Sequence, residues 1–88
     1  MRLDVLLFEL RLFKSRTQAA DAVRAGHVLL NGEPSKPSHE ARAGDRVTLV
    51  RRGEEGRARS HAFEILELPR GSLSREAARA LIREVAER

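Results

Sequence analysis

Apolar residues at the start of the chain recur with the spacing of an amphipathic helix. Four leucines follow the i, i+3, i+4, i+7 pattern of a buried helix face, namely Leu3, Leu6, Leu7 and Leu10. They predict a helix over residues 3–11. Asp4 would lie in its first turn, where a carboxylate complements the helix dipole.

A second helix is predicted directly afterwards. Ser15 is a favourable N-cap residue, and the helix should run from there to about Ala25. Its buried side would hold small apolar residues, which let two helices cross closely: Ala19, Ala22 and Val23. Gly26 follows as a left-handed C-terminal cap.

The next part of the chain has the pattern of strands and turns. Residues 28–30 predict a short strand, and Asn31-Gly32 is a strong signal for a tight turn. The polar segment 33–43 contains two prolines and should be irregular. A turn at 43–45 then leads into a strand over residues 46–50.

The last part predicts one more strand and a helix. Residues 51–59 are highly charged and should form a hairpin loop before a strand within residues 61–68. Ser72 or Ser74 would cap a final amphipathic helix that ends at about Ala86.

No repeat or break in composition divides the chain, which predicts one domain over residues 1–88. The fold class is α+β, with two N-terminal helices, a small mostly antiparallel sheet and a C-terminal helix packed against it.

Positive charge is confined to the first part of the chain. The net charge is +4, and residues 1–52 hold ten lysines and arginines against six acidic residues, whereas residues 53–88 hold seven of each sign. A charge bias within one segment favours a polyanion partner over a merely soluble basic protein.

The basic residues cluster around the turn between the two predicted helices. Arg11, Lys14, Arg16 and Arg24 have only Asp21 among them as an acid. The free backbone N–H groups at the start of the second helix also suit a phosphate. A solvated helix face with i, i+4 ion pairs is the alternative, but the excess of cations favours a clamp on an RNA backbone.

Phe13 lies within the same turn and allows two interpretations. Its ring could stack on a base or ribose of RNA, or it could fill the space between the helices.

The sequence offers few residues for a catalytic or metal site. The chain has no cysteine, and its three histidines lack the spacing of metal ligands. Ser15, Asp21 and His27 would not be brought together as a hydrolytic trio. Gly53–Gly56 matches a G-x-x-G phosphate loop in form, but its two central acids would repel phosphate. We therefore expect a non-catalytic protein without metal or cofactor.

The longest apolar run is the four residues 5–8, far shorter than a membrane span, and nothing resembles a signal peptide. These features predict a cytoplasmic protein with no membrane partner.

Several positioned motifs resemble a known family. They are RLD at 2–4, KSR at 14–16, Ala19, GHV at 26–28, NG at 31–32, Pro37 and GD at 44–45. Their order and spacing are similar to the RNA-binding domain named after small-subunit ribosomal protein S-four, over about residues 2–50. The resemblance implies an alpha-L motif, in which two helices and the adjoining loop contact structured RNA, with residues 51–88 as an extension.

The segment SKPS at 35–38, and the absence of an enzyme domain after it, make the chain most similar to the ribosome-associated heat-shock protein fifteen family. This resemblance implies binding to ribosomal RNA of the large subunit, on stalled or dissociated subunits that hold peptidyl-tRNA. It transfers the RNA contacts to Arg2, Arg11, Phe13, Lys14, Ser15, Arg16, Arg24, Asn31 and Lys36. We expect the protein to be a monomer.

Two other functions are compatible with parts of the pattern. The RNA-binding unit often precedes RNA-modifying enzymes, so a free copy could assist one in trans. Two short helices and a turn also fit a helix-turn-helix for DNA. The strand at 28–30 and the lack of a polar base-reading face on the second helix make DNA the weaker interpretation.

Overall fold

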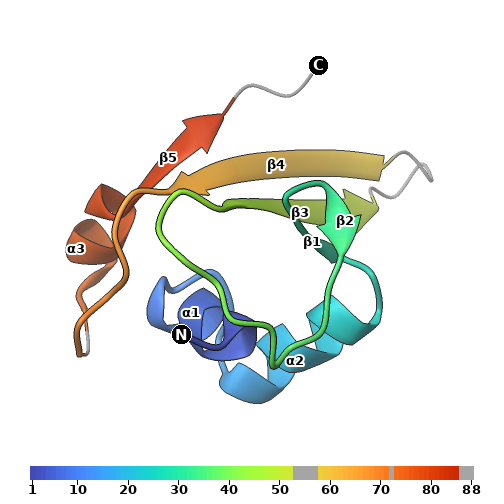
Figure 1. Ribbon diagram of the computed structural model, residues 1–88, viewed down its shortest axis with the longest axis horizontal. Helices are drawn as coiled ribbons and strands as arrows, with labels where there is room; N and C mark the ends of the chain where they lie inside the picture. Colours follow the sequence, from blue (N-terminus) through green and yellow to red (C-terminus); the bar gives the residue numbers. More distant parts are fainter. Residues whose placement is uncertain (53–57, 72, 86–88) are drawn as a thin grey trace.

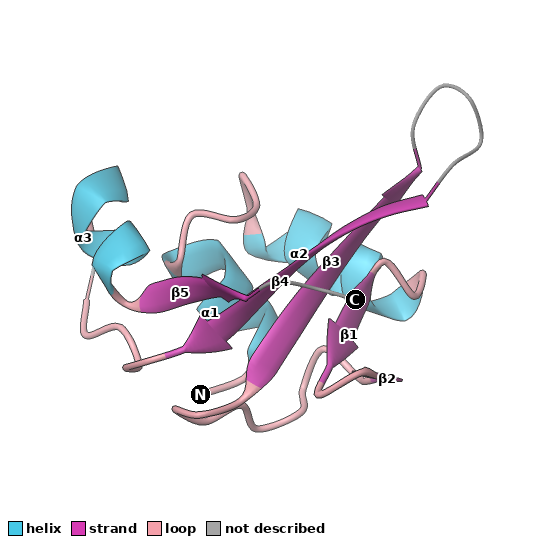
Figure 2. Ribbon diagram, turned by 90° about the horizontal axis from the view of Figure 1, so that it is seen from above, coloured by secondary structure: helices cyan, strands magenta, loops and turns pink. Residues whose placement is uncertain are grey.

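The computed structural model describes residues 1–52, 58–71 and 73–85. Its elements are α1 (Leu3–Glu9), α2 (Arg16–Arg24), β1 (Val28–Leu30), β2 (Glu33–Pro34), β3 (Arg46–Arg52), β4 (Ala58–Ile65), α3 (Arg75–Ala80) and β5 (Ile82–Val85). The strands form one antiparallel sheet in the order β2-β1-β3-β4-β5. Helices α1 and α2 cover one face of this sheet, and α3 lies at the end near β5 (Figures 1 and 2). This α+β architecture is the predicted one.

The core lies between α1, α2 and the covered face of the sheet. The four predicted leucines of the first helix are all buried, as are Ala19 and Val23 of α2. They pack with residues that alternate along the strands, namely Val28, Leu30, Val47, Leu49 and Ile65. The helix and strand periodicities therefore identified most of the core.

The predicted turn at Asn31-Gly32 joins β1 to β2. Both residues have positive φ values, 53° and 84°, and Leu30 pairs directly with Glu33 across the turn. This is the two-residue type I′ hairpin that the Asn-Gly pair favours. The prediction that 33–43 is wholly irregular was wrong in one respect, because Glu33 and Pro34 form the short edge strand β2.

The predicted C-terminal helix is the main error. Ser74 does cap α3, since its Oγ accepts a hydrogen bond of 3.2 Å from the Ala77 N–H. However, α3 ends at Ala80, and Ile82–Val85 form β5 along β4. The apolar residues Leu81, Ile82 and Val85 have a helical spacing without strand alternation, and pairing with the open edge of β4 overrode this local pattern.

The remaining strand boundaries also shift. The strand expected within 61–68 is β4, which begins earlier and ends at Ile65, and Leu66 beyond it is exposed. The hairpin loop predicted over 51–59 is shorter, because β3 and β4 still pair at Arg52 and Ala58. The G-x-x-G segment at 53–56 lies outside the described residues. None of the described helices is long and apolar enough to cross a membrane.

Candidate nucleic-acid interface

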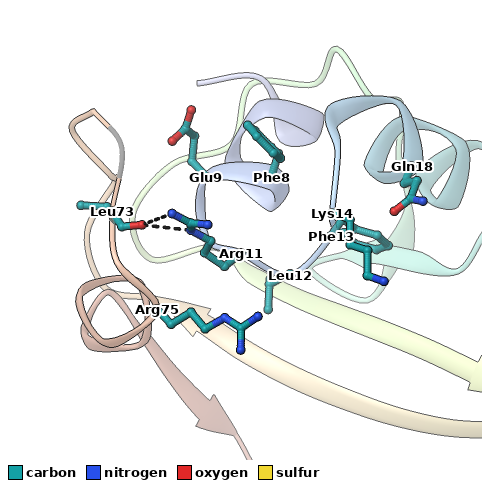
Figure 3. A pocket seen from close by; sticks show the side chains of 9 residues that line it. All are labelled: Phe8, Glu9, Arg11, Leu12, Phe13, Lys14, Gln18, Leu73 and Arg75. Carbon is teal, nitrogen blue, oxygen red and sulfur yellow. Dashed lines mark hydrogen bonds between the residues drawn. The ribbon is translucent and has the colours of Figure 1, made fainter.

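A pocket of about 710 Å³ opens between the α1–α2 turn and the segment that leads into α3 (Figure 3). Its lining comprises Phe8, Glu9, Arg11, Leu12, Phe13, Lys14, Gln18, Leu73 and Arg75. Three of the residues predicted to contact RNA therefore share one pocket: Arg11, Phe13 and Lys14. Among the described residues, the walls combine phenyl rings with three cations and a single carboxylate.

Arg11 occupies an unusual backbone position at the end of α1. Its φ is 62°, in the left-handed region that favours glycine. Its N–H bonds to the Phe8 carbonyl at 2.9 Å, and the Leu12 N–H bonds to the Leu7 carbonyl at 3.1 Å, which completes a Schellman motif. Arginine thus stands where a helix normally ends with glycine.

The side chain of Arg11 is engaged by the C-terminal part of the chain. Its Nε and Nη2 donate hydrogen bonds of 2.9 and 2.7 Å to the Leu73 carbonyl oxygen (Figure 3). Arg11 therefore ties the α1–α2 turn to the segment before α3, and two of its five guanidinium N–H donors are directed to this internal contact.

The start of α2 has the predicted N-cap. The Ser15 Oγ accepts a hydrogen bond of 3.1 Å from the Gln18 N–H, so this hydroxyl already has a role in the fold. Lys14 and Arg16 on either side are exposed. Neither side chain makes a hydrogen bond or an ion pair with any part of the chain that the structure describes. The turn thus presents two cations beside the helix N-terminus.

Arg2 and Arg16 both act on Asp4. Arg2 Nε and Nη2 donate hydrogen bonds of 3.1 Å to Asp4 Oδ1 and Oδ2, and this carboxylate is buried. Burial raises the pKa of Asp4, but the hydrogen bonds from Arg2 and the Val5 N–H, with the charges of Arg2 and Arg16, lower it below its ordinary value of 3.8. Arg2 is therefore tied to a carboxylate rather than free for phosphate.

Three other residues predicted to contact RNA are not among those that line this pocket. Arg24 pairs with Asp21 at 3.1 Å, both of them exposed. Asn31 accepts a bond from the Arg46 N–H at 2.9 Å and donates to Asp45 at 3.3 Å, so its amide joins the β1–β2 turn to β3. Lys36 is exposed on the loop after β2.

The position of Phe13 fits the packing role considered from the sequence and leaves its ring accessible from the pocket. Its side chain is half-buried and packs against the hydrophobic core, and it also lines the pocket beside Lys14 and Gln18 (Figure 3). The ring is held in place by packing and still faces open space.

No motif or charge pattern in the sequence predicted Arg75 as part of this site. Arg75 is exposed on α3, and the docking of Leu73 on Arg11 brings it to the pocket. Residues 53–88 are balanced in charge, so composition offered no signal for a basic contact there. Across the parts of the chain that the structure describes, no group of three or more histidines and acids could hold a metal ion.

The chain matches known proteins both in sequence and in fold. Residues 1–47 match the model of the S4 domain. The chain is 43% identical over 49 residues to the RQC P-site tRNA stabilizing factor of Helicobacter pylori, a match that covers 56% of this chain and 58% of the factor. It is 36% identical over 64 residues to small ribosomal subunit protein uS4 of Trichlorobacter lovleyi, a match that covers 72% of this chain and 31% of uS4. The chain thus spans less than two thirds of these curated relatives.

A solved structure extends the likeness to nearly the whole fold. The trimeric structure of Vibrio cholerae heat shock protein 15 superposes with a TM-score of 0.84 at 31% identity, over 98% of this chain and 82% of that one. The likeness includes the C-terminal region that the S4 match leaves out. The chain therefore belongs to the S4 domain family of RNA-binding proteins and, within it, to the heat shock protein 15 family.

Proposed function

We propose that this protein binds structured RNA without catalysis, most specifically ribosomal RNA of the large subunit. The observation that carries the proposal is the pair Lys14 and Arg16, which are exposed beside the N-terminus of α2 and unpaired within residues 1–52, 58–71 and 73–85. Cations whose side chains make no direct ion pair with a carboxylate are free to replace the counterions of a phosphate backbone. S4 domain and heat shock protein 15 relatives are RNA-binding and non-catalytic families, which supports the same conclusion.

We favour the large subunit as the target because the chain covers a larger share of the tRNA stabilizing factor than of the small-subunit protein. The alignment covers 58% of the P-site tRNA stabilizing factor and only 31% of uS4, and the heat shock protein 15 fold extends through β5. We therefore propose a cytoplasmic, ribosome-associated factor that acts on stalled or dissociated subunits holding peptidyl-tRNA.

The two ends of α2 would contribute differently to RNA binding. Lys14 and Arg16 would grip successive phosphates, and the Ser15 cap would hold the start of α2 in register with them. Arg24 would contribute from the far end of the helix, although it shares its charge with Asp21. We propose residues 2–50 as the RNA-binding core, with residues 51–88 as an extension of the same domain.

Sedimentation with purified ribosomes and separated subunits tests this function. The protein should travel with free large subunits, and binding should fall steeply with salt. For about four to six phosphate contacts, the logarithm of affinity should fall by roughly four to five per tenfold rise in salt. A double variant, Lys14→Ala/Arg16→Ala, should lose most of this binding and lower the salt slope by about 1.5 to 2.

The matched control is Arg42→Ala/Arg70→Ala, which removes the same charge from two exposed positions outside the pocket. It should bind subunits nearly as well as the parent. Equal losses in the two double variants would show that net charge, not the α1–α2 turn, drives the interaction. Capture of an RNA-modifying enzyme instead of subunits would favour the accessory role. Sedimentation of the free protein would test our prediction of a monomer against the trimer of the Vibrio relative.

A further inference from the structure

The pocket beside the α1–α2 turn has the chemistry of a nucleotide site. Phe8, Leu12 and Phe13 are half-buried and give it apolar walls, while Arg11, Lys14 and Arg75 outnumber Glu9, the one carboxylate among the described lining residues. Its volume of about 710 Å³ is within the range of pockets that take small organic ligands. An aromatic surface with an excess of positive charge complements a base joined to phosphate.

Two cations of this pocket remain available to a ligand. Arg11 is engaged by the Leu73 carbonyl through Nε and Nη2. Lys14 and Arg75, by contrast, are exposed, and their side chains make no hydrogen bond or ion pair with the residues that the structure describes. Figure 3 shows them on different sides of the opening, Lys14 from the turn and Arg75 from α3. A phosphate-bearing group between them would be contacted from two elements far apart in the sequence.

We propose that this pocket holds one unpaired nucleotide of the bound RNA. Its base would lie against the rings of Phe8 and Phe13, and its phosphates would contact Lys14 and Arg75. A base within a duplex is stacked and cannot present its face to a phenyl ring, whereas a bulged or looped base can. The inference rests on the proposed RNA-binding function and adds the class of structure that this site recognises.

Arg11 has a positioning role in this arrangement. Its two hydrogen bonds fix Leu73, which lies two residues before Arg75, against the turn that carries Lys14. The extension after β4 thereby completes a pocket that the S4 match over residues 1–47 contains only in part. Arg75 becomes an RNA contact that neither composition nor the family motifs indicated.

Fluorescence anisotropy with two labelled RNA hairpins tests the proposal. The hairpins share one stem, and only one of them carries a single bulged adenosine. The parent protein should bind the bulged hairpin at least about fivefold more tightly, the lower range for one base stacked on an aromatic ring. Arg75→Ala should remove most of this preference. Arg70→Ala, which deletes an exposed arginine outside the pocket, should keep it.

A spectroscopic measurement separates stacking from simple charge attraction. A 2-aminopurine at the bulge should be quenched when the parent binds, and Phe13→Leu or Phe8→Leu should reduce this quenching while preserving apolar volume. Unchanged quenching in both variants would overturn the placement of the base. So would equal affinity of the parent for the two hairpins, or an equal effect of Arg75→Ala and Arg70→Ala.

The outcomes distinguish failure of the nucleotide site from failure of the proposed RNA-binding function. A parent that binds ribosomal subunits but does not discriminate between the hairpins would retain the proposed function and lose the nucleotide site. A parent that binds neither would lose both. Displacement of the bulged hairpin by an acidic peptide of equal charge, as efficiently as by unlabelled hairpin, would identify a general anion site and overturn the proposal.

Discussion

Helices α1 and α2 lie side by side on the sheet, but their N-termini are capped in different ways. The first N–H groups of α1 bond to carbonyls of a distant loop: Leu3 N–H to His39 at 2.8 Å and Asp4 N–H to Pro37 at 3.1 Å. Its N-cap residue, Arg2, provides no side-chain cap for these N–H groups. The start of α2 is instead capped by its own neighbour, Ser15.

The C-terminal ends show the same contrast. Both helices finish in a Schellman motif with a residue in the left-handed region. In α2 this residue is Gly26, for which the conformation carries little strain. In α1 it is Arg11, and its side chain bonds to Leu73, 62 residues further along the chain. Both helices thus end in a local backbone cap, but in α1 the capping residue also bonds to the C-terminal segment.

The difference shows how the turn between the helices is held. Because α2 begins and ends with local caps, its position as a helix is largely set by its own sequence. α1 depends on the 37–39 loop at one end and on Leu73 at the other. The pocket at the α1–α2 turn is therefore sensitive to residues throughout the chain, and the following variants test that dependence.

Loss of packing beneath α1 should have the largest effect. Leu7 is fully buried, and its carbonyl also closes the cap of α1. Leu7→Ala should lower the free energy of unfolding by about 2–5 kcal/mol through lost burial and the cavity left behind. Chemical denaturation measures this. Ala77→Gly on the exposed side of α3 is the comparison and should cost only about 1 kcal/mol. Similar losses in both variants would contradict a core centred under α1.

Gly26→Ala tests the local cap of α2. The φ of Gly26 is 80°, and an added Cβ would meet nothing within 4 Å, so the substitution introduces backbone strain without a clash. We expect a loss of about 1–2 kcal/mol in the free energy of unfolding. Gly26→Asn should cost less, because asparagine tolerates this conformation better. Equal stability of the alanine variant and the parent would mean that α2 does not need its glycine.

The corresponding test for α1 uses two substitutions at Arg11. Both remove the bonds to Leu73, but Arg11→Ala keeps the strained backbone while Arg11→Gly relieves it. The glycine variant should therefore be more stable than the alanine variant by about 1 kcal/mol. Amide protons of α3 should exchange faster than in the parent in both variants, because Leu73 is released. Unaltered exchange in α3 would show that Arg11 does not hold this segment.

The contrast between the helices also explains which parts of the fold could be predicted. Ser15, Gly26 and Asn31-Gly32 are local signals, and the structure confirms each of them. The leucine periodicity likewise located α1 and its buried face. Such features depend on neighbours within a few residues, so they can be predicted from a single sequence.

The features that were missed depend on distant partners. Nothing near Ile82 indicates that it will pair with Ile65 rather than continue a helix. Nothing near Arg11 indicates a left-handed backbone, since the sequence offers arginine where glycine is expected. The same limit applies to the candidate site. The turn with Lys14 was predicted, but Arg75 joins it only through tertiary contact.

The smallest effect concerns the start of α1 and appears as a dependence on pH. The pKa of Asp4 in the folded protein is lowered below 3.8, so the folded state binds fewer protons than the unfolded state near that pH. Stability contributed by Asp4 is therefore present above about pH 4 and lost as pH falls through the folded-state pKa.

Denaturation of the parent between pH 5 and pH 3 should show this loss of stability, and Asp4→Asn should show a shallower loss. Glu67→Gln, at an exposed position outside α1, is the matched control and should follow the parent. Parallel curves for Asp4→Asn and the parent would mean that the Arg2–Asp4 pair does not stabilise the first turn of α1.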